Sequence, residues 1–330
     1  MRAASQPLLS RVADSIYWMG RYIERAENVA RFLGVNQNLM LDLPREYGGQ
    51  WEPIVDTSGD RAIFHEHYGA GTEENVVQFL AFDLRNRNSI CSCVLAAREN
   101  ARSVRETISS EMWEQINSLY LLVMEESRKP VEVLPEFCHQ VRMACHLFQG
   151  VTDVTMSHNE AWHFIRLGTT LERADKTTRM LDVKYFILLP AVADVGTPYD
   201  DIQWAAVLKS VSGFEMYRKR YGRISPERIV EFLLLDGEFP RAVRHCIGLA
   251  DQSLHAITGT PAGAFSCVSE QRIGLLRSEL DYAQSEAVIK SGLHEFFDAL
   301  EAKMNRIDEC ILGDFFVQSF ATAQGSRTAP

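Results

Sequence analysis

The chain has 330 residues, of which 46% are hydrophobic and 24% are charged, a composition typical of a folded globular protein and not of a disordered or collagen-like one. Its formal net charge of −10 argues against non-specific binding to nucleic acid, because proteins of that class gather Lys and Arg against phosphate. No run of eighteen or more apolar residues occurs, so neither a membrane-spanning helix nor a membrane partner is predicted.

The cysteines and the N-terminus predict a cytoplasmic location. Seven cysteines, an odd number with no Cys-x-x-Cys pair, are typical of reduced thiols in a cytosolic protein. Residues 1–10 lack the apolar core of a signal peptide. Cys138-His139 recurs as Cys145-His146, but two helical turns separate the pairs by about 10.5 Å. That separation is too large for one ion, so no metal site is predicted there.

Apolar residues recur every three or four positions over most of the chain, whereas the strict alternation of a β-strand is nearly absent. The pattern therefore predicts an all-α protein. In chain order, the expected helices span residues 10–42, 73–84, 89–108, 110–127, 135–157, 159–188, 226–235, 240–257, 268–290 and 293–320. Ser225-Pro226 has the serine cap and the first-turn proline that begin a helix. Residues 321–330 are small and polar and are predicted to form a disordered tail.

Two stretches of the chain resemble two later stretches, which indicates an internal duplication. Residues 19–27 (MGRYIERAE) match residues 167–175 (LGTTLERAD), and the offset from Gly20 to Gly168 is 148 residues. Residues 72–83 match residues 225–236 at an offset of 153, which Trp51 and Trp204 share.

A third match pairs residues 99–105 with residues 238–244 at the smaller offset of 139, which implies extra residues in the first copy. Residues 1–320 are therefore interpreted as a single domain of two repeats, about residues 10–130 and 155–320. Because neither copy can bury its apolar faces alone, we expect an internally duplicated helical bundle with pseudo-two-fold symmetry.

The first matched helix in each copy carries polar residues beside an apolar stripe. The stripe has spacings of three and four and is the predicted packing face: Met19, Ile23, Ala26, Ala30 and Leu33, and in the second copy Leu167, Leu171, Ala174, Thr178 and Leu181. A second strip beside it holds Gly20, Glu24, Glu27 and Arg31, and in the second copy Gly168, Glu172, Asp175 and Arg179. At 100° per residue, Arg25 and Arg173 are placed on the opposite flank.

The repeated Glu-Arg motif has two interpretations. In the structural one, Glu24 and Glu172 pair with arginines from other helices and orient the packing, with Arg102 and Arg241 as the leading partners. In the functional one, the two strips line a shared cleft, where arginines hold a carboxylate or phosphate and Glu24 or Glu172 is the catalytic base. The two differ in whether both glutamates line one solvent-connected pocket.

Several segments together resemble the alpha-E family, a bacterial all-helical domain named for its Glu-Arg motif. They are the doubled Gly-x-x-x-Glu-Arg-Ala motif, residues 97–102, Trp113-Glu114 with Asn117, and residues 232–241. The resemblance covers about residues 8–315. It implies an association with circularly permuted ATP-grasp ligases and transglutaminase-like proteins, and hence a system that forms or modifies peptide or amide bonds.

The resemblance and the absence of a nucleotide motif predict an accessory role. The chain has no Gly-rich phosphate loop of the P-loop or Rossmann type, so we expect no cofactor and do not expect the ligase itself. We expect an accessory or substrate-binding component whose partners are the ATP-grasp ligase, the transglutaminase-like protein or a peptide substrate.

Two alternatives stay open at the level of sequence. The first is an enzyme of the same system that uses the Glu/Arg-lined cleft for acid–base chemistry on a peptide or amide. The second is a di-metal helical bundle, suggested by Glu136-x-x-His139 and Glu160-x-x-His163. Neither of these spacings falls at a duplicated position, and chance explains them, so no metal ligand is assigned.

Overall fold

The computed structural model describes residues 8–42, 51–129, 134–186 and 198–317. Within these ranges the chain folds into successive helices without a strand, which confirms the all-α prediction. The predicted tail at residues 321–330 lies outside them.

The helices of the first half of the chain begin with the longest one. They are α1 (Ser10–Asp42), α2 (Glu52–Ser58), α3 (Arg61–His67), α4 (Glu73–Val77), the π-helical turn η2 (Gln78–Phe82), α5 (Ile90–Ser103), α6 (Ser110–Glu126) and α7 (Leu134–Thr155). The second half contains α8 (Glu160–Phe186), α9 (Pro198–Ser210), α10 (Phe214–Tyr221), α11 (Pro226–Val230), the π-helical turn η5 (Glu231–Leu235), α12 (Val243–Thr258), α13 (Val268–Tyr282), α14 (Ser285–Ser291), α15 (Leu293–Ile311) and the π-helical turn η6 (Leu312–Phe316).

Four of these helices were not among those predicted: α2, α3, α9 and α10. Three of them span only seven or eight residues, too few turns for an apolar period to be recognised. The apolar residues of α9 are spread around the helix and form no stripe. The helix predicted over residues 268–290 is in fact two helices, because the backbone is extended at Ala283 and Gln284. The sequence did not reveal this break, since no Gly or Pro occurs there.

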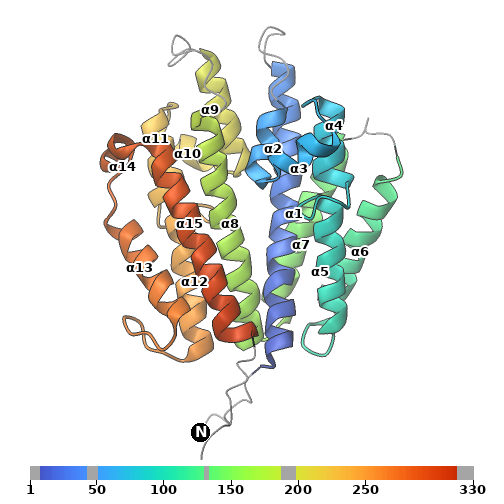
Figure 1. Cartoon of the computed structure of the whole chain (residues 1–330), viewed down its shortest axis with the longest axis vertical. Helices are drawn as coiled ribbons and strands as arrows, with labels where there is room; N and C mark the ends of the chain where they lie inside the picture. Colours follow the sequence, from blue (N-terminus) through green and yellow to red (C-terminus); the bar gives the residue numbers. More distant parts are fainter. Residues whose placement is uncertain (1–7, 43–50, 130–133, 187–197, 318–330) are drawn as a thin grey trace, which may run out of the picture.

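α1 and α8 lie side by side at the centre of the molecule, and each belongs to one half (Figure 1). α1 packs against α5 and α7, and α6 contacts both of these helices. In the same way, α8 packs against α12 and α15, and α13 contacts both. Each half is thus a bundle of four long helices, and the two bundles meet through α1 and α8. α7, which the predicted repeat boundaries left between the copies, is the fourth helix of the first bundle.

The predicted packing faces of α1 and α8 are confirmed. Every residue of the two apolar stripes is buried: Met19, Ile23, Ala26, Ala30, Leu33, Leu167, Leu171, Ala174, Thr178 and Leu181. All of them except the polar Thr178 belong to one continuous hydrophobic core that runs through both bundles.

Matched local geometry recurs at the offset of 153 residues. η2 and η5 are π-helical turns at matched positions, and each is followed by an aspartate. Asp83 Oδ1 accepts a hydrogen bond from the backbone N of Arg85 at 2.8 Å, and Asp236 Oδ1 accepts one from the backbone N of Glu238 at 2.7 Å. Further along, the thiol of Cys93 donates to the carbonyl of Arg87, and that of Cys246 to the carbonyl of Pro240. These parallels support the inferred duplication.

The predicted match of the third block, residues 99–105 with residues 238–244, is wrong. Residues 99–103 form the last turns of α5, whereas residues 238–242 precede α12 and are not helical. The loops between the π-helical turns and the next helices, residues 83–89 and 236–242, have equal length, so the first copy has no extra residues there. The offset of 153 therefore continues, and the position that matches Arg241 is Asn88 and not Arg102.

Candidate functional site

Two glycines let α1 and α8 approach closely. A Cβ added at Gly20 would lie 2.7 Å from the carbonyl oxygen of Ile165, and one added at Gly168 would lie 2.4 Å from the carbonyl oxygen of Tyr17. Such distances exclude any side chain, so glycine is required at both positions. Each glycine precedes the motif glutamate of its helix by four residues, one turn along the interface.

The motif residues of the two helices bind each other reciprocally. Arg173 of α8 donates to Glu24 of α1 through Nε at 2.9 Å and Nη2 at 2.8 Å. Arg25 of α1 donates to Glu172 of α8 through Nε at 2.7 Å and Nη2 at 2.8 Å. The prediction that Arg25 and Arg173 point to the opposite flank is therefore wrong. Their long side chains reach across the interface to the facing helix. The result is two bidentate ion pairs.

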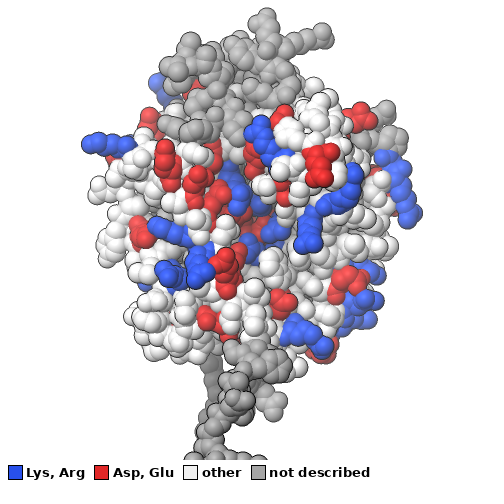
Figure 2. Space-filling model, viewed as in Figure 1, with Lys and Arg blue, Asp and Glu red and all other residues white. Residues whose placement is uncertain are grey.

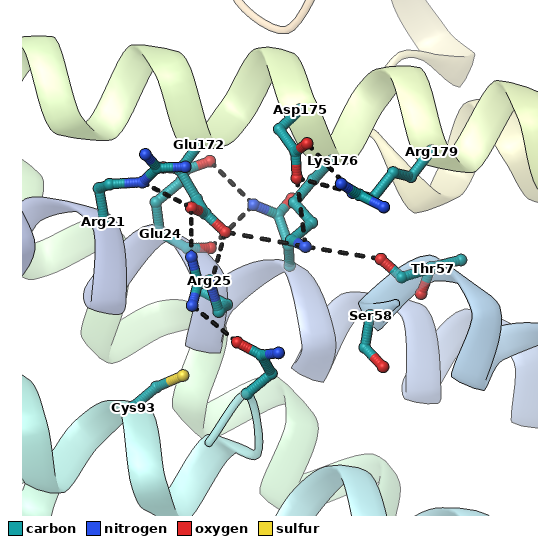
Figure 3. A network of polar contacts seen from close by, with 12 residues as sticks. Arg21, Glu24, Arg25, Thr57, Ser58, Cys93, Glu172, Asp175, Lys176 and Arg179 are labelled. Carbon is teal, nitrogen blue, oxygen red and sulfur yellow. Dashed lines mark hydrogen bonds and ion pairs between the residues drawn. The ribbon is translucent and has the colours of Figure 1, made fainter. Parts of the chain in front are cut away.

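Further donors complete the coordination of each carboxylate. Glu24 also accepts from Arg241 Nη1 and from Gln149 Nε2, each at 2.9 Å. Arg241 was one of the two predicted partners, and this contact confirms it, although Arg241 lies in the turn before α12. Glu172 also accepts from Arg21 Nε at 2.9 Å (Figure 3).

Arg102, the other predicted partner, is not part of the network. It lies near the end of α5, its side chain is 66% exposed, and it pairs with Glu99 at 2.6 Å. The prediction failed because it relied on the third repeated block, which aligned helical residues with loop residues.

The remaining residues of the two polar strips extend the network along the interface. Glu27 binds Arg31 one turn away and Arg241 Nη2 at 2.8 Å. Asp175 binds Arg179 at 2.9 Å (Figure 3). Arg179 also binds Glu301 of α15 at 2.9 Å. Residues of both strips thus form ion pairs within their own helix, and these pairs extend to Arg241 and to α15.

Burial and charge decide what the two motif glutamates can do. Both are fully buried, with no exposed surface, so they do not line an open cleft. Burial alone would raise their pKa values, but the guanidinium groups of Arg173 and Arg241 lower the pKa of Glu24, and those of Arg25 and Arg21 lower the pKa of Glu172. A catalytic base near neutral pH needs the opposite shift. The geometry therefore agrees with the structural interpretation of the motif.

Residues 8–316 match the alpha-E family, described as a predicted alpha-helical domain with a conserved ER motif. The chain belongs to the alpha-E family. Its two Glu-Arg pairs, Glu24-Arg25 and Glu172-Arg173, are the residues that bridge α1 and α8. In this alpha-E chain the named motif is thus a reciprocal ion-pair bridge.

The chain is similar to uncharacterised proteins of Mycobacterium bovis and Mycobacterium tuberculosis. Each is 23% identical over 94% of this chain. The alignments cover 37% of those proteins, so this chain spans little more than a third of their length. No solved structure matches it significantly.

The two Glu-x-x-His sequences lie away from this network, whereas His146 of the repeated Cys-His pair contacts Glu27 at 3.1 Å. Glu136 accepts from Gln140, and His139 contacts Arg142, while Glu160 accepts from the backbone N of Leu8. Among the described residues, the group with metal-ligand spacing is Asp182, His294 and Asp298, which includes no member of the two Glu-x-x-His sequences. There, the two ring nitrogens of His294 face the two aspartates at 2.8 and 3.5 Å.

Two groups at the edges of the alpha-E network have shifted pKa values. Burial and the charges of Arg31 and Arg241 lower the pKa of His146 to about 4. Burial raises the pKa of Glu301 to about 7, with Asp175 adding to the rise and Arg179 opposing it. Figure 2 shows side chains of both signs interspersed over one face of the molecule. In the described part of the chain, no helix combines the length and the apolar character needed to cross a bilayer.

Proposed function

We propose that this alpha-E chain is a binding component, and not the catalyst, of an ATP-grasp-linked system that forms or modifies peptide or amide bonds. The observation that carries the proposal is the burial of Glu24 and Glu172 as ionised partners of arginines. Such groups hold two helices in register and leave no free base or acid for a substrate. The alternative of an enzyme with a Glu/Arg-lined cleft loses its geometric support.

The relatives support a role beside other protein regions. An alpha-E region that occupies 37% of a longer relative leaves room for further parts in the same polypeptide. In this proposal, the circularly permuted ATP-grasp ligase is the first partner, and the transglutaminase-like protein or the peptide product is the second.

A surface of α7 is suited to such contacts. Met143, Leu147 and Val154 lie on one face of this helix and are 43%, 55% and 79% exposed. Large apolar side chains grouped on one exposed face are typical of surfaces that bind other proteins. We assign the ligase contact to this face of α7.

The test is binding of the purified chain to the circularly permuted ATP-grasp protein of the same genome. Calorimetry is expected to show a defined complex, and the chain is expected to raise the yield of ligase product. Leu147→Glu places a charge on the α7 face and is expected to weaken the complex about tenfold or more. Leu275→Glu is the matched control, because Leu275 is similarly exposed, at 54%, on α13. If no complex forms and product yield is unchanged, the accessory role is wrong.

A further inference from the structure

A cavity of about 270 Å³ lies between α1, α7, α8 and α12. Arg173, which binds Glu24, forms part of its wall, whereas Glu24 itself lies behind it. Ile23, Phe148 and Leu249 supply an apolar surface. Pockets for drug-sized molecules usually hold about 300–1,000 Å³, so this cavity suits a smaller ligand.

The cavity lies where the second copy has the shorter side chains, since Thr169 and Thr170 match Arg21 and Tyr22 of the first. Arg21 directly follows Gly20 in α1. Its side chain fills the space beside Glu172 and binds Glu172, Tyr17 and Asp308. The matching residue of α8 is Thr169, which is too short to do the same and lines the cavity instead. Gln149 supplies the hydrogen bond to Glu24 at 2.9 Å that Arg21 supplies to Glu172. The space that Arg21 fills in one half is therefore open in the other.

One cationic group in the wall lacks an anionic partner. Within the described residues, the guanidinium of Arg166 makes no hydrogen bond or ion pair, and it lies 5.3 Å from the ring centre of Trp162. Burial lowers the pKa of Arg166, and the charge of Asp153 only partly opposes this. Asp153 also lines the cavity, is 64% exposed, and contacts His158 at 3.5 Å. A positive and a negative group thus flank one opening without pairing with each other.

We propose that this cavity binds a small zwitterion with an apolar side chain, of the class of free hydrophobic amino acids. The ligand carboxylate pairs with Arg166, its ammonium group faces Asp153, and its side chain packs against Phe148 and Leu249. The carboxylate supplies the anionic partner that Arg166 lacks, and a guanidinium binds a carboxylate in a bidentate manner. This proposal does not depend on the ATP-grasp system.

The test is calorimetric titration of the full chain with L-leucine. One molecule is expected to bind per chain. L-Leucinamide, which lacks the carboxylate, and the Arg166→Gln variant with L-leucine are each expected to bind about tenfold or more weakly. Arg102→Gln is the matched control, because Arg102 is an exposed arginine outside the cavity, and it is expected to bind L-leucine normally.

A filling variant tests the location. Thr169→Arg rebuilds the side chain that Arg21 supplies in the other half, so it is expected to fill the cavity and abolish binding while the protein keeps its helical circular-dichroism spectrum. Thr169→Val keeps the size of threonine and is expected to bind as the unmodified chain does. If the unmodified chain does not bind L-leucine, the proposal is wrong. Equal binding of L-leucinamide would overturn the carboxylate contact, and full binding by folded Thr169→Arg would overturn the location.

The outcome is separable from that of the proposed function. Thr169→Arg leaves the exposed face of α7 unchanged, so it is expected to bind the ATP-grasp protein normally. Loss of leucine binding with retained ligase binding supports both proposals. Loss of ligase binding in Thr169→Arg would contradict the separation of the two sites.

Discussion

At the level of single residues, the alpha-E motif combines a buried carboxylate, whose desolvation is unfavourable, with the arginines that offset this desolvation free energy. A carboxylate buried as completely as Glu172 is tolerated only when cations and donors surround it, and Arg25 and Arg21 do so. The helical spacing of the motif predicted that these glutamates lie beside the core. Of their partners, Arg241 was predicted from the repeats, but Arg173 and Arg25 were not, because reach across an interface depends on how closely two backbones approach.

Glu172→Gln is expected to lower the free energy of unfolding by about 3–5 kcal/mol, because it leaves buried arginines without a counter-charge. Urea denaturation measures this change. Glu99→Gln is the control, since Glu99 forms an exposed pair with Arg102 and its loss is expected to cost at most about 1 kcal/mol. A Glu172→Gln protein as stable as Glu99→Gln would contradict the buried bridge.

Acidification is expected to act through the same carboxylates. The folded state lowers the pKa of Glu24 and Glu172 below the ordinary glutamate value of 4.5, so their contribution to stability is complete above that pH. It is lost as pH falls through the folded pKa values, between about pH 5 and pH 2. Unfolding free energies measured across this range should fall less steeply in Glu172→Gln than in the unmodified chain. Equal slopes would show that Glu172 is not held ionised.

Glu301 is expected to produce the opposite dependence. Its pKa in the folded protein is raised to about 7 from 4.5, so the folded state binds the extra proton between these values. Stability from this residue is present below about pH 4.5 and is lost as pH rises through 7. Glu301→Gln should therefore reduce the loss of stability between about pH 5 and pH 8, as measured by urea denaturation at each pH. An unchanged loss would mean that Glu301 has an ordinary pKa.

At the scale of elements, the contact of α1 with α8 determines which residues meet. The long helices were predictable because they have several apolar periods, and their stripes are the buried faces. Short helices such as α2 and α3 have too few turns to show a period, and the break between α13 and α14 carries no Gly or Pro. The predicted match of residues 99–105 with residues 238–244 was wrong because similar short sequences occur there in a helix and in a loop.

Gly168→Ala is expected to destabilise the protein by about 1–3 kcal/mol, because its Cβ would meet the backbone of α1 at Tyr17. Gly150→Ala is the matched control. Gly150 lies within α7, and a Cβ there meets nothing within 4 Å. This change should stabilise the protein by about 0.5–1 kcal/mol through helix propensity. Thermal denaturation that gave both substitutions the same sign would contradict close backbone contact at Gly168.

At the scale of the whole molecule, the two bundles depend on each other. Glu24 of the first takes its charge partners from Arg173 and Arg241 of the second, and Glu172 takes Arg21 and Arg25 from the first. The fold class and the pairing of similar halves followed from periodicity and repeats. The cavity beside Thr169 could not be predicted in this way, because a short side chain leaves a cavity only if no neighbouring side chain fills the space.

This interdependence predicts one cooperative unfolding transition. Tryptophan fluorescence and far-ultraviolet circular dichroism, followed in the same urea titration, are expected to give coincident curves. Trp51 and Trp204 lie buried in different halves, so fluorescence reports on both. Two separated transitions would mean that the bundles fold as independent units.

A double-mutant cycle between Glu24 and Arg173 measures whether the Glu-Arg motif holds α1 against α8. The unfolding free energies of Glu24→Gln, Arg173→Gln, the double variant and the unmodified chain give the coupling between the two side chains. A bridge of two hydrogen-bonded charges across the interface is expected to give a coupling of about 1–3 kcal/mol, with the double variant less destabilised than the sum of the single ones. Effects that add within about 0.5 kcal/mol would show that Glu24 and Arg173 are not coupled, and would contradict the structural role of the motif.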